Sequence, residues 1–131
     1  MTRNACSIKS ARALGSAIAA LFAPGGLAEA PIAAVVGEAV VAGTVDRLRV
    51  DQDRVLFVDY KTGRRVPETV TDAPPAHLRQ MAAYAAALAV IFPRRRVEAA
   101  LLYTAGPKIL TVPADLLDRY KPGFAAAQHN L

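Results

Sequence analysis

Residues 43–63 read GTVDRLRVDQDRVLFVDYKTG, and this stretch decides the fold. Apolar and polar side chains alternate on both sides of the turn-forming segment Asp51-Gln52-Asp53. Such alternation around a short polar turn is typical of two antiparallel strands joined in a hairpin. The stretch therefore predicts a β-hairpin whose two strands have a defined register.

The register of this hairpin brings two acidic residues together. A turn centred on Gln52 and Asp53 places Leu48 opposite Phe57, an apolar pair that supports the register. Continuing it places Asp46 opposite Asp59, with Cβ atoms about 5 Å apart. Residues two apart share a face, so Lys61 lies on the same side as the two aspartates.

Two opposed carboxylates repel each other unless a positive group lies between them. Mg²⁺ suits such a site because it prefers oxygen ligands and keeps several waters, so that two carboxylates and a substrate phosphate complete its shell. The alternative is that Asp59 and Lys61 form a solvated strand end and Asp46 pairs with an arginine. Geometry alone leaves both interpretations open.

The flanking sequence extends the hairpin into an α/β domain. Periodicity and turn residues predict the following elements: a helix over 7–22, strands over 27–36, 39–50 and 54–60, a polar loop over 64–75, a helix over 76–91, strands over 98–103 and 109–112, and a short helix over 114–120. We expect a central mixed sheet, a three-stranded meander plus one or two later strands, flanked by helices. Residues 1–131 are expected to form a single domain.

Composition restricts the compartment and the partner. The net charge of +5 favours an anionic partner, the single Cys6 cannot form an internal disulfide, and no run is long enough for a membrane span. Basic residues, an apolar run and Ala28-Glu29-Ala30 resemble a secretory signal. Gly15 and Ser16 interrupt that run and Pro31 would follow the cut, so we expect a cytoplasmic protein, with a secreted domain as the alternative.

Three motifs resemble the PD-(D/E)XK nuclease superfamily, in particular the RecB-like nuclease domain at the C-terminus of the AddA helicase-nuclease subunit. They are GTVDR at 43–47, VDYKTG at 58–63 and QMAAY at 80–84, in the family's order. The similarity extends over about 22–118. It implies a restriction-endonuclease-like core and the activity of a Mg²⁺-dependent deoxyribonuclease, with Mn²⁺ as a substitute.

The resemblance also implies roles for individual residues. Asp46 and Asp59 would hold the metal, the main-chain carbonyl of Tyr60 would add a ligand, and Lys61 would orient or activate the attacking water. Glu29 matches an acidic residue that this family often carries before the hairpin, where it joins the metal site. A single glutamate on a first strand is otherwise usually solvated.

Further candidate residues follow the second motif and occupy the helix. Gln80 and Tyr84 are four apart, so they project from one helix face, which in the family borders the active site. Gln80 would bind a phosphate or the metal's water. Tyr84 would contact DNA or pack on the catalytic strand, the alternative being a buried aromatic residue. Thr62, Arg64 and Arg65 are the predicted DNA contacts, whereas the run at 94–96 is expected to be solvated.

The sequence departs from the family pattern upstream of the hairpin. Family members usually carry a Gly-Xaa-Xaa-Xaa-His helix, whereas this chain has Ala19 four residues after Gly15. There is no phosphate-binding loop for ATP either, so unwinding requires a helicase subunit or domain as partner. We therefore expect an exonuclease that acts on single- or double-stranded DNA ends in break repair. The alternative is a catalytically weakened module that binds DNA or docks onto a helicase-nuclease complex.

Overall fold

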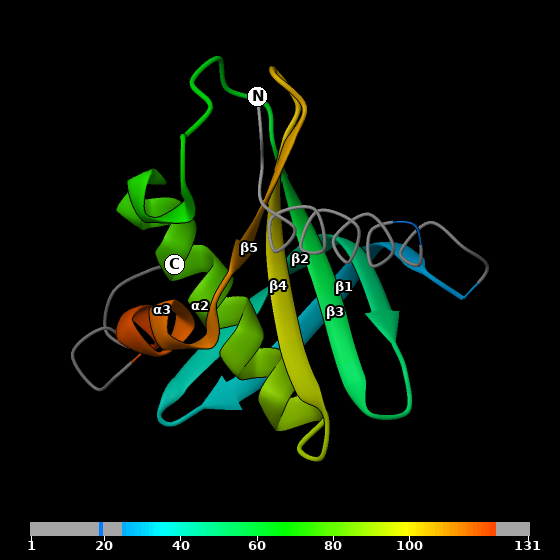
Figure 1. Cartoon of the computed structure of the whole chain (residues 1–131). Coiled ribbons are helices and arrows are strands. Elements are labelled where there is room, and N and C mark those ends of the chain that lie inside the picture. Colours follow the sequence, from blue (N-terminus) through cyan, green and yellow to red (C-terminus); the bar gives the residue numbers. More distant parts are fainter. Residues whose placement is uncertain (1–18, 20–24, 123–131) are drawn as a thin grey trace.

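The computed structural model describes residue 19 and residues 25–122. Its elements, in chain order, are β1 (Leu27–Val36), β2 (Ala39–Val50), β3 (Arg54–Lys61), the single 3₁₀ turn η1 (Val70–Asp72), α2 (Pro75–Ile91), β4 (Arg96–Tyr103), β5 (Lys108–Val112) and α3 (Ala114–Tyr120). Figure 1 shows a curved sheet with α2 lying diagonally across one of its faces. The chain is thus an α/β fold built on one central sheet.

The sheet follows the order of the chain, β1-β2-β3-β4-β5. All neighbouring strands are antiparallel except β3 and β4, which are parallel. A parallel pair needs a crossover connection, and α2 supplies it by carrying the chain from one end of the sheet back to the other. The beginning of α2 lies near the carboxyl ends of β3 and β4, since Gln80 contacts Lys61 at the end of β3 and His77 contacts Tyr103 at the end of β4.

Helix α2 forms because its sequence is rich in alanine and leucine, and Pro75 occupies its first turn, where a missing N–H is harmless. The helix ends at Ile91, two residues before Pro93. Its inward face packs on the sheet through Leu78, Met81 and Leu88, all almost fully buried. These residues belong to the main hydrophobic core, which also includes Leu116 and Leu117 of α3.

The predicted register of the hairpin is confirmed. Leu48 pairs with Phe57 and Val50 with Val55. Phe57 and Val55 face α2 and are fully buried, whereas the alternate residue Val58 is buried on the opposite face of the sheet. Strand alternation therefore determines which side chains of β3 reach the helix and which do not.

The element boundaries agree with the sequence-based prediction to within two residues. The differences are small extensions of β3, β4, β5 and α2, and the 3₁₀ turn within the predicted loop. The helix predicted over 7–22 lies outside the described residues apart from Ala19, which is helical. Neither of the α-helices α2 and α3, in the part of the chain that the structure describes, is long and apolar enough to cross a membrane.

Candidate active site

The acidic site lies where the hairpin ladder ends. Backbone pairing between β2 and β3 extends only to Arg47 and Val58, one pair short of the two aspartates. Beyond it, the Tyr60 amide donates to the Oδ2 atom of Asp46 at 2.7 Å. The carboxylate thus takes the place of a backbone acceptor, so the Asp46 side chain points from β2 towards β3.

The ladder ends here because the side chains of β2 change the face of the sheet on which they lie. Val45 and Leu48 are three residues apart, yet both are buried in the main core beneath α2. A regular strand would place them on opposite faces, so β2 reverses its facing between them, at the position of Asp46. On the neighbouring strand Glu29 has a φ of 48°, which is unusual for a residue with a side chain. Such departures from regular strand geometry concentrate near functional sites.

Asp59 is the buried member of the acidic pair. Only 7% of the residue is exposed. Burial raises the pKa of the Asp59 carboxyl, the Lys61 ammonium lowers it, and the neighbouring Asp46 raises it again, with a net upward shift. The two carboxyl groups therefore interact directly, as the register predicts, and Asp59 is not the solvated strand end of the alternative interpretation. Among the described residues, Asp46 forms no ion pair with an arginine.

Lys61 joins the acidic pair to α2. Its Nζ atom lies 2.7 Å from Oδ2 of Asp59 and donates to Oε1 of Gln80, also at 2.7 Å. Its side chain is only 16% exposed. The cation is thus held between a strand carboxylate and a helix amide, and three of the predicted catalytic residues form one connected group.

Tyr84 lies one helical turn after Gln80 and packs against both β2 and β3. Its ring makes an edge contact with Phe57, with the ring centroids 6.5 Å apart. Its hydroxyl and ring edge occupy the space in which a Cβ atom on Gly43 would lie, since that atom would meet the Cζ atom at 2.9 Å. The glycine that begins the first motif is therefore required by the tyrosine that ends the third.

Tyr60 and Glu29 lie beside the two aspartates. The Tyr60 amide points to β2, and the next carbonyl, that of Lys61, accepts from Thr104 beside β4. Since the N–H and C=O groups of one strand residue point to the same side, the Tyr60 carbonyl also points towards β2. Glu29 is exposed and lies between the pairs that flank Asp46 in the β1–β2 register.

The predicted DNA contacts lie in the segment that leaves the site. Thr62, Arg64 and Arg65 follow β3 directly and are exposed. None of them forms a hydrogen bond or ion pair with another residue in the described part of the chain. The structure therefore places them next to the site in the chain without joining them to it.

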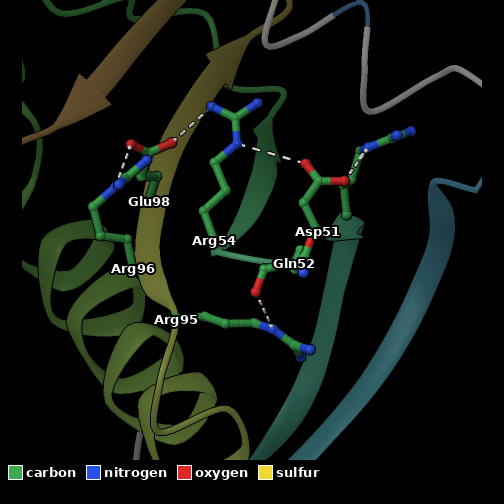
Figure 2. A network of polar contacts seen from close by, with 7 residues as sticks. Asp51, Gln52, Arg54, Arg95, Arg96 and Glu98 are labelled. Carbon is green, nitrogen blue, oxygen red and sulfur yellow. Dashed lines mark hydrogen bonds and ion pairs between the residues drawn. The ribbon is translucent and has the colours of Figure 1, made fainter.

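The arginine run at 94–96 lies near the amino end of β3, whereas the acidic pair lies near its carboxyl end. Figure 2 shows Arg54, at the start of β3, between Asp51 and Glu98, with Arg96 on the other oxygen of Glu98 and Arg95 on the carbonyl of Gln52. β3 spans eight residues, so this network is about 20 Å or more from Lys61. Arg95 and Arg96 are therefore engaged in surface contacts away from the acidic pair, and Arg94 is exposed.

Two residues near Lys61 were not identified from the sequence. Nδ1 of His77 lies 3.3 Å from the hydroxyl of Tyr103, and Tyr103 pairs with Lys61 in the β3–β4 register. Burial and the charge of Lys61 lower the pKa of His77. The sequence does contain a signal for this arrangement, because His77 precedes Gln80 by three residues and so shares its helix face.

The donor set fits a hard divalent cation. Two carboxylates from adjacent strands converge, and a backbone carbonyl points to the same side. In the described residues no group of three or more His, Cys, Asp or Glu is placed to hold a metal. Mg²⁺ usually binds through one or two carboxylates and retains waters, so a pair of aspartates satisfies its requirement.

Comparison with known proteins identifies the family of this chain. No curated protein matches the sequence. Among solved structures, one titled "Crystal structure of SSO0001" is similar at a TM-score of 0.47 and 14% identity, covering 87% of this chain. This chain spans 57% of that one. The profile of the PD-(D/E)XK nuclease superfamily matches residues 9–127, which include every candidate residue described above. The chain therefore belongs to the PD-(D/E)XK nuclease superfamily.

Proposed function

We propose that this protein is a Mg²⁺-dependent DNA nuclease that hydrolyses phosphodiester bonds. The observation that carries the proposal is the convergence of Asp46, Asp59, Lys61 and Gln80 from two strands and one helix. Two carboxylates and a lysine held by an amide match the needs of metal-assisted phosphodiester hydrolysis. Membership of the nuclease superfamily supports the same reaction.

Asp46, Asp59 and the main-chain carbonyl of Tyr60 would hold the metal. Glu29 on the neighbouring strand would have to turn its exposed side chain towards the pair to become an additional ligand, because the three carboxylates do not form a metal-binding group in the described residues. A bound Mg²⁺ supplies a water of lowered pKa and neutralises charge on the phosphoryl oxygen. The upward-shifted pKa of Asp59 supports this assignment. A buried carboxyl beside a second carboxyl is costly to ionise, so a bound cation would stabilise its ionised form strongly.

Lys61 orients the attacking water and stabilises the negative charge that develops on the phosphate. Gln80 holds the lysine in place through its Oε1 atom, so the ammonium group does not need to be ordered when substrate binds. The amide nitrogen of Gln80 carries two further donors for a phosphate oxygen or a water.

Thr62, Arg64, Arg65 and Tyr84 are the proposed DNA contacts. The two exposed arginines leave the site on the segment after β3, where they can neutralise phosphates without reading the base sequence. Tyr84 already packs on β2 and β3. Its contribution to DNA binding is therefore to hold these β-strands in the position that the sugar-phosphate backbone of the DNA approaches. The net charge of +5 supports an anionic substrate.

We further propose that the enzyme is an exonuclease of the RecB-like, AddA-type branch that acts with a helicase partner in break repair. This finer assignment rests on the three motifs at 43–47, 58–63 and 80–84. The partner would supply the unwinding and expose the DNA end to the site.

The decisive experiment incubates the purified chain with end-labelled linear and with circular DNA, single- and double-stranded, in Mg²⁺, Mn²⁺ or EDTA. We expect cleavage of linear DNA that requires the metal and is abolished in Asp59→Ala. Arg94→Ala is the matched control, because Arg94 is exposed and distant from the acidic pair. Release of terminal nucleotides from linear DNA, with circular DNA intact, distinguishes an exonuclease from an endonuclease.

Two results would contradict the proposal. Absence of cleavage under all conditions, or equal cleavage by Asp59→Ala, would remove the enzymatic assignment. DNA binding that persists in the absence of cleavage would favour the alternative, a nuclease-like module that binds DNA or docks onto a helicase-nuclease complex.

A further inference from the structure

We propose that His77 is a further substrate-contacting residue, whose neutral imidazole is oriented by Tyr103 so that Nε2–H donates to a non-bridging phosphate oxygen of the DNA. This inference rests on the proposed nuclease function and assigns a role to a residue outside the three motifs.

The position of His77 places it at the border of the site. It lies in the first turn of α2, three residues before Gln80, so both side chains project from the helix face that meets β3. Tyr103, its partner, is the β4 residue that pairs with Lys61. In a parallel pair such neighbours share a face of the sheet, so Lys61 and Tyr103 present their side chains to the same region. The charge of Lys61 accordingly acts on His77.

We assign one tautomer to His77, because the buried hydroxyl proton of Tyr103 needs an acceptor and Nδ1 of His77 is the one that it meets among the described residues. Tyr103 is 1% exposed, and burial raises the pKa of its hydroxyl, which therefore keeps its proton. Among the described residues, its hydrogen-bonding partner is Nδ1 of His77 at 3.3 Å. With the hydroxyl as donor, Nδ1 is the acceptor and the imidazole proton lies on Nε2. The tilted packing of the two rings holds this orientation.

The environment also keeps the imidazole neutral. Burial and the nearby Lys61 both lower the pKa of His77, so a second cation does not form beside the lysine at neutral pH. The side chain remains partly exposed. Its Nε2–H is thus an oriented, uncharged hydrogen-bond donor next to the Lys61 ammonium. Lys61 would attract the phosphate as a point charge, and the Nε2–H of His77 would fix the orientation of the phosphate oxygen.

A set of substitutions separates phosphate contact from a structural role. In His77→Asn the amide lies near the Nδ1 position and can still bond to Tyr103, whereas in His77→Gln the longer side chain carries an N–H donor near the Nε2 position. His77→Ala removes both. We would measure kcat and KM on a fixed oligonucleotide in Mg²⁺, and the thermal midpoint of each variant to control for folding.

We expect His77→Ala to lower kcat/KM by about tenfold or more, the usual effect of losing a hydrogen bond to a charged group. His77→Gln should recover most of the loss and His77→Asn should not. Tyr103→Phe removes the orienting hydroxyl and should lower kcat/KM by an intermediate amount. In the His77→Gln background, the same substitution should leave kcat/KM unchanged. Unchanged kinetics in His77→Ala, or rescue by His77→Asn to the same degree as by His77→Gln, would overturn the inference.

The inference and the proposed function fail in different ways. If the wild-type chain cleaves DNA and His77→Ala is unaffected, only the role of His77 is lost. If the wild-type chain does not cleave, the enzymatic assignment is lost, and fluorescence anisotropy of the same oligonucleotide in Ca²⁺ then tests His77. Weaker binding by His77→Ala and His77→Asn, with recovery in His77→Gln, supports the phosphate contact, and equal binding by all variants removes it.

Discussion

Gly43 shows how a single position links the strand that carries Asp46 to the helix that carries Gln80. The ring of Tyr84 fills the space beside its Cα atom, so the glycine is required for close approach and not for an unusual φ. Any larger side chain would displace the ring and with it the packing of α2 over β2. The first and third motifs are therefore coupled through a contact that lies beside the proposed catalytic groups without being part of them.

Substitution of Gly43 by alanine is expected to cost about 1–3 kcal/mol in the free energy of unfolding, because the new methyl group would overpack against Tyr84. Urea denaturation measures the change. Gly63→Ala is the matched control, since a Cβ atom there meets nothing within 4 Å. In a Tyr84→Ala background the cost at Gly43 should largely disappear. A full cost in that background would show that the two residues are not coupled.

His77 provides a pH-dependent prediction at the same scale. Its pKa in the folded protein lies below the ordinary histidine value of 6.5, so between these two pKa values the unfolded chain binds more protons than the folded one. Stability contributed by His77 is therefore present above 6.5 and is lost as the pH falls towards the folded-state pKa. Urea titrations at several pH values give the free energy of unfolding as a function of pH. In this window, the slope of that function should differ between wild type and His77→Gln. Parallel curves would contradict the lowered pKa.

At the scale of elements, the two ends of β3 carry charge in different environments. At its amino end Arg54 bridges Asp51 and Glu98 with about 29% of its side chain exposed (Figure 2). At its carboxyl end Asp59 and Lys61 form a much less exposed pair under α2. The exposed network joins β3 and β4 where their parallel pairing begins, whereas the buried pair belongs to the site.

Arg54→Ala is expected to lower stability by less than about 1 kcal/mol, because exposed ion pairs are weak, and the loss should shrink as NaCl is raised. Leu101→Ala, a substitution at a fully buried core residue of β4, should cost about 2–5 kcal/mol at any salt concentration. Chemical denaturation by urea at low and high salt compares them. A large, salt-independent effect of Arg54→Ala would mean that its role is packing.

At the scale of the whole molecule, the proposed metal site would make stability depend on divalent cations. A cation that binds the folded chain alone stabilises it by about 2.7 kcal/mol at a concentration 100 times its Kd. We expect Mn²⁺ or Mg²⁺ to raise the thermal midpoint by several degrees in wild type and in Arg94→Ala, but not in Asp59→Ala. An equal rise in the Asp59 variant would place the cation elsewhere. This measurement needs no DNA and so tests the metal assignment independently of cleavage.

Most of the architecture could be predicted from the sequence because it depends on local signals. Strand alternation, the turn at 51–53, and the alanine-rich helix bounded by proline each act over a few residues, and all were recovered nearly to their ends. The register of β2 and β3 followed from the apolar pairs around a short turn, since a shift by one residue would expose Phe57 and bury charges. The proximity of Asp46 to Asp59 was therefore already a property of the sequence.

What only the tertiary structure decided are the contacts made across the crossover. The hydrogen bond from Lys61 to Gln80, the ring of Tyr84 over Gly43, and the pair of His77 and Tyr103 all join residues from α2 to distant strands. The reversed facing of β2 at Asp46 likewise follows from packing on both sides of that residue. Local propensity determines where strands and helices form, but the angle and distance at which α2 crosses the sheet come from the packing of the whole core. That packing turns two neighbouring aspartates into a site with a held lysine.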